Sequence, residues 1–205
     1  DVATAINVVS RAPIDGAVQA RLVAEAMRVE QQIGALPPVD ANGFRAVVPI
    51  NALHAQAYAI CGAVRAAQGK PPLVVWRANP WDFLDPLELP DKLPAPAVTV
   101  AAMRGETRAA AINMANCTAA PINIAAKFTG LPGGAMPHDI VAHDVLWTDT
   151  RQGVLVAAAL PKLTSTPNGF AFVIPAGMTR QLWLSVTPRN LPAGTHNGGL
   201  ILTGR

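Results

Sequence analysis

The spacing of apolar residues changes once along this chain, and that change most constrains its fold. In the first seventy residues, apolar side chains recur every three or four positions, as on one face of an α-helix. From Val98 onward they alternate every second position, as in a half-buried β-strand. Between these parts, prolines at positions 80, 86, 90, 94 and 96 disfavour helix and strand pairing alike. The sequence therefore predicts three parts, over residues 1–70, 71–97 and 98–205.

Two helical stripes account for residues 1–70. The first has Asp15 as its N-cap and consists of Val18, Leu22, Ala26, Val29, Ile33 and Leu36. The second has Asn51 as its N-cap and consists of Leu53, Ala57, Ile60 or Cys61, and Val64. Such a pair buries too little surface to fold alone. We therefore expect an antiparallel helical hairpin that packs on the rest of the chain.

Alternating segments separated by glycine and proline turns fill residues 98–205. The predicted strands are 98–103, 107–116, 121–128, 140–148, 154–160, 169–175, 180–187 and 198–203. Residues 73–76 in the connector are interpreted as a further short strand, and the rest of the connector as an extended segment laid over the surface. Short strands at this spacing predict a mainly β fold, an antiparallel β-sandwich preceded by the helical hairpin.

Composition narrows the class of protein. The chain is 51% hydrophobic and 14% charged, which excludes a disordered tail. It has no apolar run long enough to span a membrane. Its net charge of +3 comes from scattered arginines and lysines, so we expect no nucleic-acid partner. The chain starts at Asp1 rather than methionine, which we expect of an exported protein without its leader or of a piece of a longer protein.

The C-terminal half resembles a known group of domains. Ile174–Val186 and Pro192–Leu202 resemble the closing strands of bacterial Ig-like or fibronectin-like β-sandwich domains, and Met103–Glu106 with Ala111–Asn116 resembles their opening segment. The resemblance implies such a domain in a large secreted bacterial protein, of the kind associated with glycoside-hydrolase-like modules. It carries over no catalytic residue. His196 stands where those domains usually have an aromatic residue.

The tryptophans are the best candidates for ligand binding, because flat aromatic faces stack on sugar rings. Trp183 lies on the strand face opposite Leu182 and Leu184. It serves as a ligand platform if that face is open and as an interface residue if the hairpin covers it, and the hairpin's need for an apolar partner favours the interface. Trp76 and Trp81 are interpreted as pinning the connector to the fold, with sugar binding as the alternative.

The sequence contains few residues in patterns typical of catalytic or metal sites. The connector carboxylates Asp82, Asp85, Glu88 and Asp91 are expected to be solvated or to cap turns. His143 and Asp144 point to opposite faces of a strand, so we expect no metal site and no cofactor. Cys61 and Cys117 are either inert thiols or a disulfide that ties the hairpin to the sandwich.

These observations predict a non-enzymatic accessory or interaction domain of an exported bacterial protein, and the resemblance implies that this protein is a carbohydrate-active one. Its partners would be other domains or subunits of a larger protein, or a polysaccharide. Two alternatives stay open. One is a carbohydrate-binding module that uses Trp183, Trp76 and Trp81, and the other is a structural subunit that docks through strand edges.

Overall fold

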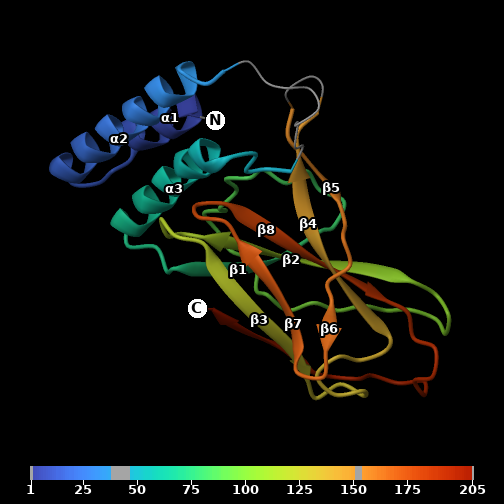
Figure 1. The fold of residues 1–205 in the computed structure, drawn as a ribbon. Coiled ribbons are helices and arrows are strands. Elements are labelled where there is room, and N and C mark those ends of the chain that lie inside the picture. The colour runs from blue at the N-terminus through green and yellow to red at the C-terminus, as the bar shows by residue number, and fades with distance from the viewer. Residues whose placement is uncertain (1, 38–46, 151–153, 205) are drawn as a thin grey trace.

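The computed structural model describes residues 2–37, 47–150 and 154–204, which form three helices and two antiparallel sheets (Figure 1). The helices are α1 (Val2–Arg11), α2 (Gly16–Gly34) and α3 (Ala52–Ala67). The strands are β1 (Leu73–Ala78), β2 (Arg108–Asn116), β3 (Ile122–Thr129), β4 (Ile140–Thr148), β5 (Val156–Ala159), β6 (Ser165–Thr166), β7 (Gly169–Ile174), β8 (Thr179–Val186) and β9 (Gly199–Gly204). The prediction of a mainly β protein is confirmed.

Both predicted helix caps are present. The Asp15 side chain accepts hydrogen bonds from the backbone N–H groups of Ala17 and Val18, at 2.9 and 3.1 Å. The Asn51 side chain accepts one from the backbone N–H of His54 at 2.8 Å. These side chains satisfy donors that have no partner within the helix, which is why α2 and α3 begin where the sequence indicates.

The prediction of a two-helix hairpin was wrong, because α1 adds a third helix. Ala5 and Val9 of α1 are buried in a cluster with Leu22 of α2 and Ile60 of α3. α1 spans only ten residues, but its apolar side chains lie strongly on one side, so the signal was present in the sequence and the prediction overlooked it. The three helices share one small core and lie together at one end of the molecule (Figure 1).

The nine strands form two antiparallel sheets. The five-stranded sheet has the order β1-β2-β8-β4-β5, and the four-stranded sheet has the order β6-β7-β3-β9. Most predicted strands match an observed strand to within two residues at either end. The strand predicted over 98–103 was wrong: this segment forms no strand, although Val98 and Val100 pack against the core. Apolar residues alternate in this segment because one of its sides packs on the core, although its backbone does not pair with a neighbouring strand.

The hydrophobic cluster with the most buried residues draws on both sheets. Each sheet contributes the apolar residues of one face, at every second position of its strands. The five-stranded sheet supplies Ala110, Ile112, Met114, Ala142, Leu182 and Leu184, and the four-stranded sheet supplies Ile124, Ala126, Phe128, Phe170, Phe172 and Ile174.

The helical bundle attaches to the end of the sheets through two glycines. A Cβ atom on Gly62 of α3 would lie 2.0 Å from the Thr118 carbonyl oxygen, just beyond β2. A Cβ atom on Gly177, which has a φ of 65°, would lie 1.8 Å from the carbonyl oxygen of Tyr58 in α3. Only glycine permits this approach of helix backbone to loop backbone.

Residues 79–94, which we call the strap, leave β1 and cross the outer face of the five-stranded sheet. The backbone N–H of Thr179 in β8 donates to the Pro86 carbonyl at 2.7 Å, and Leu89 packs beside Trp76 of β1. Because the strap crosses this face and the core lies on the other side, nearly every residue of β2 is buried. The expectation of an extended segment laid over the surface describes the strap well.

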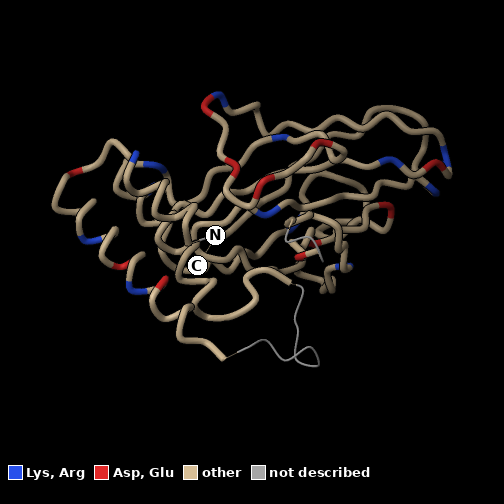
Figure 2. The backbone as a smooth tube through the Cα atoms, turned by 90° about the horizontal axis from the view of Figure 1, so that it is seen from above, with Lys and Arg blue, Asp and Glu red and all other residues tan. Residues whose placement is uncertain are grey.

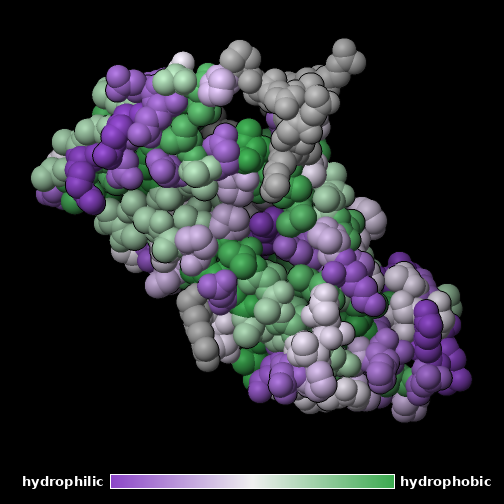
Figure 3. Space-filling model, viewed as in Figure 1, coloured by the Kyte–Doolittle hydropathy of each residue, from purple (hydrophilic) through white to green (hydrophobic). Residues whose placement is uncertain are grey.

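The outer face of the four-stranded sheet is not covered in this way. Residues in β3 and β7 alternate between buried and exposed positions, and Ala125, Ala171 and Val173 are exposed. Apolar and polar side chains lie side by side on the molecular face in Figure 3. The two sheets therefore differ in what lies outside them.

Charged side chains are spread along the chain rather than gathered. Lysine and arginine are interspersed with aspartate and glutamate along the backbone, from the helices to the far ends of the sheets (Figure 2). Within the described residues, no helix is both long enough and apolar enough to cross a membrane.

Candidate functional site

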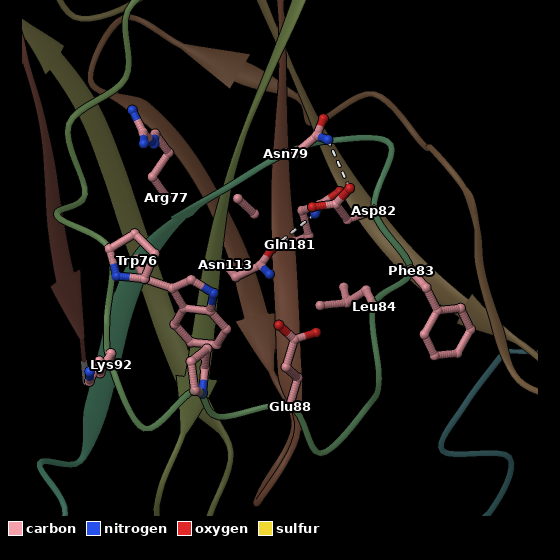
Figure 4. Close-up of a pocket in the computed structure, with 13 residues that line it drawn as sticks. Trp76, Arg77, Asn79, Asp82, Phe83, Leu84, Glu88, Lys92, Asn113 and Gln181 are labelled. Carbon is pink, nitrogen blue, oxygen red and sulfur yellow. Dashed lines mark hydrogen bonds between the residues drawn. The ribbon is translucent and has the colours of Figure 1, made fainter.

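A pocket of about 470 Å³ lies between the strap and the outer face of the five-stranded sheet. Its volume falls within the range of small-molecule binding sites. Aromatic, aliphatic, amide and charged side chains meet in it (Figure 4). The residues that line it are Trp76, Arg77, Ala78, Asn79, Asp82, Phe83, Leu84, Glu88, Pro90, Lys92, Pro94, Asn113 and Gln181.

Two buried amides contribute polar groups on the sheet side of the pocket. Asn113 of β2 and Gln181 of β8 are cross-strand partners on the outer face, only 3% and 4% exposed. Gln181 Nε2 donates to Asn113 Oδ1 at 2.9 Å. Among the described residues, Asn113 Nδ2 and Gln181 Oε1 have no protein hydrogen-bond partner, yet neither is sealed from solvent. The pair therefore offers one donor and one acceptor to a ligand.

Two strap carboxylates face the same space. Figure 4 shows the Glu88 side chain extending into the pocket, while Asp82 accepts a hydrogen bond from Asn79 Nδ2 at 2.8 Å. Asp85 caps a turn instead, because its side chain accepts from the Leu87 backbone N–H at 2.7 Å. Glu88 Oε2 also accepts from the Asp85 backbone N–H, at 3.4 Å, so Asp85 and Glu88 cap the same turn. The expectation of capping roles therefore describes both residues, and it did not foresee that Asp82 and Glu88 also line the pocket.

Exposed aromatic rings stand beside the pocket. Trp81 and Phe83 of the strap are 78% and 74% exposed. Trp81 meets Trp183 of β8 edge to face, with ring centroids 5.2 Å apart and planes at 88°. The ring against Trp183 thus comes from the strap, whereas we had favoured the helices as its cover. The edge contact holds the Trp81 ring while leaving most of its surface open to solvent.

Trp76 has the opposite environment. It is 2% exposed and belongs to a cluster with Val74, Ala115 and Cys117, against which Leu89 of the strap packs. It lies in the same cross-strand row as the amide pair, since it is the register partner of Asn113. Trp76 therefore forms part of the pocket wall and anchors the strap.

Both cysteines are buried and free in the structure. Cys61 belongs to the core of the helical bundle, and Cys117 to the cluster around Trp76. Burial raises the pKa of Cys61 to about 11 and also raises that of Cys117. The disulfide that the sequence allowed is therefore not formed in the structure, and buried thiols of this kind are inert.

His143 and Asp144, which we considered as metal ligands, contact other parts of the fold. His143 Nδ1 lies 3.2 Å from the Leu160 carbonyl oxygen. Asp144 Oδ1 lies 3.5 Å from Nε of Arg180, and both side chains are almost wholly enclosed. Burial raises the pKa of Asp144, and the nearby Arg180 partly counteracts this shift. No three His, Cys, Asp or Glu side chains gather as a metal site within the described ranges.

Asn116-Cys117-Thr118 matches the sequence pattern of an N-glycosylation acceptor, but the Asn116 side chain is buried. Its Nδ2 donates to three backbone carbonyls, of Ala120, Ile174 and Pro175, at 2.8 to 3.1 Å. Its Oδ1 accepts from Thr118. This side chain ties the end of β2 to the end of β7 and is closed to modification.

Comparisons with known proteins give one partial likeness. No protein-family model matches the chain, and no curated protein matches it. Among the solved structures that it resembles is a family 123 glycoside hydrolase from Clostridium perfringens, studied for glycolipid glycan hydrolysis. The two are 17% identical with a TM-score of 0.47, over 66% of this chain and 25% of that chain. The chain thus spans about a quarter of the length of that protein.

That neighbour corrects one expectation. It is a glycoside hydrolase, and this finding overturns the prediction that the chain is not an enzyme. The non-enzymatic assignment is therefore dropped.

Proposed function

We propose that the chain is a carbohydrate-binding domain whose ligand occupies the pocket under the strap and stacks on Trp81. The observation that carries this proposal is the combination of an exposed, edge-supported indole with a polar pocket beside it. Sugars have apolar faces that pack on aromatic rings and hydroxyl groups that need hydrogen-bond partners. Trp81 offers the first kind of contact and the pocket offers the second.

The polar groups of the pocket suit hydroxyl groups in particular. A hydroxyl both donates and accepts, and the amide pair leaves one free acceptor and one free donor. Glu88 adds an acceptor from the opposite side, on the strap. Because Asn113 and Gln181 are fixed by their mutual hydrogen bond, a ligand would meet groups that are already in place.

The domain would serve an exported, carbohydrate-active protein as an accessory part. We further propose that its two sheets form an Ig-like β-sandwich. The shared cluster between the sheets and the antiparallel pairing of all strands support this arrangement. The helical bundle and the strap then serve as additions that build the pocket on one outer face.

The test is binding of the full chain to four hexasaccharides, built from glucose, xylose, mannose and N-acetylglucosamine, by isothermal titration calorimetry. We expect at least one to bind, Trp81→Ala to weaken it about tenfold, and Trp81→Phe to weaken it less. Met27→Ala is the matched control, since Met27 is an exposed apolar residue on α2. Absence of binding by the native chain to all four would refute the proposal.

The same samples test for hydrolysis. If reducing sugar is released from a bound hexasaccharide, Asp82→Asn and Glu88→Gln should each suppress the release, because theirs are the carboxylates that line the pocket. Release that both variants retain would place the chemistry elsewhere.

A further inference from the structure

We infer that Thr179 and Arg65 are positioning residues for Glu88, so that the helical bundle takes part in ligand binding through the strap. This inference rests on the proposed function. It concerns how the pocket side chain that comes from the strap, rather than from the sheet, is held in place.

Three consecutive carbonyl groups of the strap are each held by a side chain or backbone group of the fold. The Pro86 carbonyl accepts from the Thr179 backbone N–H at 2.7 Å. The Glu88 carbonyl accepts from Thr179 Oγ1 at 2.6 Å. The Leu87 carbonyl between them accepts from the Arg65 guanidinium. The strap is therefore fixed at the residue that carries the pocket carboxylate.

Both donors are themselves fixed. Thr179 is fully buried at the start of β8, and Arg65 is buried in α3. Arg65 also donates to the Gly177 carbonyl at 3.2 Å, so one guanidinium bridges the helix, the strap and the loop before β8. A buried guanidinium has a strong requirement for such acceptors, and carbonyl groups on two segments meet it here.

The register of β8 explains why this anchoring aims Glu88 at the amide pair. Thr179 and Gln181 are two residues apart on one strand, so their side chains leave the same face of the sheet about 7 Å apart. The Glu88 backbone is held above Thr179, and Gln181 is the next residue of β8 on that same face. The Glu88 side chain can therefore extend toward Gln181. Figure 4 shows the Glu88 carboxylate extending into the pocket on that side.

A purely structural role would predict something different. If Thr179 and Arg65 only stabilise the fold, their loss affects binding regardless of what residue 88 is. If they act by aiming Glu88, their loss matters only while the Glu88 side chain is present. A double-mutant cycle separates the two, because it isolates the coupling between two residues.

The experiment compares Thr179→Val, which removes the hydroxyl group and keeps the branched shape, with Thr179→Ser, which keeps the hydroxyl group. Each is made in the native chain and in Glu88→Ala, and affinity is measured with the four hexasaccharides above. We expect Thr179→Val to weaken binding about five- to tenfold, and Thr179→Ser to stay within about twofold. In Glu88→Ala, we expect Thr179→Val to have no further effect.

Arg65→Lys gives an independent second test and keeps the inference falsifiable if Thr179→Val does not fold. Lysine keeps the charge but loses the forked donors that reach two carbonyls. We expect it to weaken binding in the native chain and not in Glu88→Ala. Urea unfolding of each variant shows whether it is folded.

The outcomes separate this inference from the proposed function. If the native chain binds no hexasaccharide, the proposed function and this inference both fail. If it binds, and the losses caused by Thr179→Val or Arg65→Lys persist in Glu88→Ala, the carbohydrate site stands and the positioning role is refuted.

Discussion

The two sheets share one core but differ in their outer faces. β3 in the four-stranded sheet alternates between buried and exposed residues, and its outward positions meet solvent. β2 in the five-stranded sheet is buried at nearly every position, because the strap lies over its outer face. A strand shows period two in burial only when one of its faces is free. The comparison shows that the strap, rather than the sheet itself, buries the outward residues of β2.

The cover also changes which residues an outer face can carry. On the open face, small and polar side chains such as Ala125, Asn123 and Thr203 lie in contact with solvent. On the covered face, an amide pair is buried, and burial of an amide is tolerated only with hydrogen-bond partners. Asn113 and Gln181 satisfy one hydrogen bond with each other, and their remaining polar atoms reach solvent through the opening of the pocket.

The same charge placed on the two outer faces should give the largest difference. Ala111 of β2 is buried beneath the cover, and Ala125 of β3 is exposed. We expect Ala111→Asp to lower the free energy of unfolding by about 3 to 5 kcal/mol, because it buries an unpaired carboxylate. We expect Ala125→Asp to stay within about 0.5 kcal/mol. Urea unfolding of both variants measures this, and equal effects would show that the two faces do not differ.

The attachment of the helical bundle should give an intermediate effect. Gly62→Ala would place a Cβ atom 2.0 Å from the Thr118 carbonyl oxygen, so we expect a loss of about 1 to 3 kcal/mol in unfolding free energy. Gly34→Ala at the end of α2 is the matched control, since nothing lies within 4 Å of its Cβ position. We expect it to be neutral or slightly stabilising. A Gly62→Ala variant as stable as the control would contradict the close packing of α3.

The smallest effect, a slower chemical labelling without loss of stability, concerns the two buried thiols, Cys61 in the helical bundle and Cys117 in the cluster around Trp76. Because burial raises the pKa of Cys61 to about 11, roughly one thiol in a thousand is a thiolate at pH 8. We expect iodoacetamide to label the folded chain slowly, and faster as the pH rises.

Mass spectrometry of the chain unfolded in urea without reductant provides the check on pairing. Two added groups are expected, since both cysteines are free in the structure. A chain that takes up no label in urea would carry the disulfide that the sequence allowed.

The elements of secondary structure could largely be read from the residue pattern. Asp15 and Asn51 mark two helix starts because capping is a local interaction between neighbouring residues. Three strands of the four-stranded sheet, β3, β7 and β9, follow from alternation because one side of that sheet is free, whereas the two-residue strand β6 was not predicted. Alternation over 98–103 was misleading because one-sided burial can occur without strand pairing.

The candidate site was only half visible in the sequence. Trp76, Trp81 and Trp183 were singled out by residue type, and the structure places all three on or around the covered face. Asn113 and Glu88 were missed as partners, because they lie on separate segments that only the strap brings together. One signal was present: Asn113 interrupts the otherwise apolar stretch Ala109–Ala115, where a polar residue needs a reason.

The sequence by itself determined the order of the parts, the helix caps and the apolar faces of the strands, because these depend on residues close in the chain. Only the tertiary structure decided that the strap crosses β8, that Trp81 rather than a helix meets Trp183, and that Glu88 and Gln181 line one pocket. These contacts join residues far apart in the chain. Proline-rich segments make no regular ladder bonds of their own, so their course is set by the acceptors and donors they meet on the folded surface.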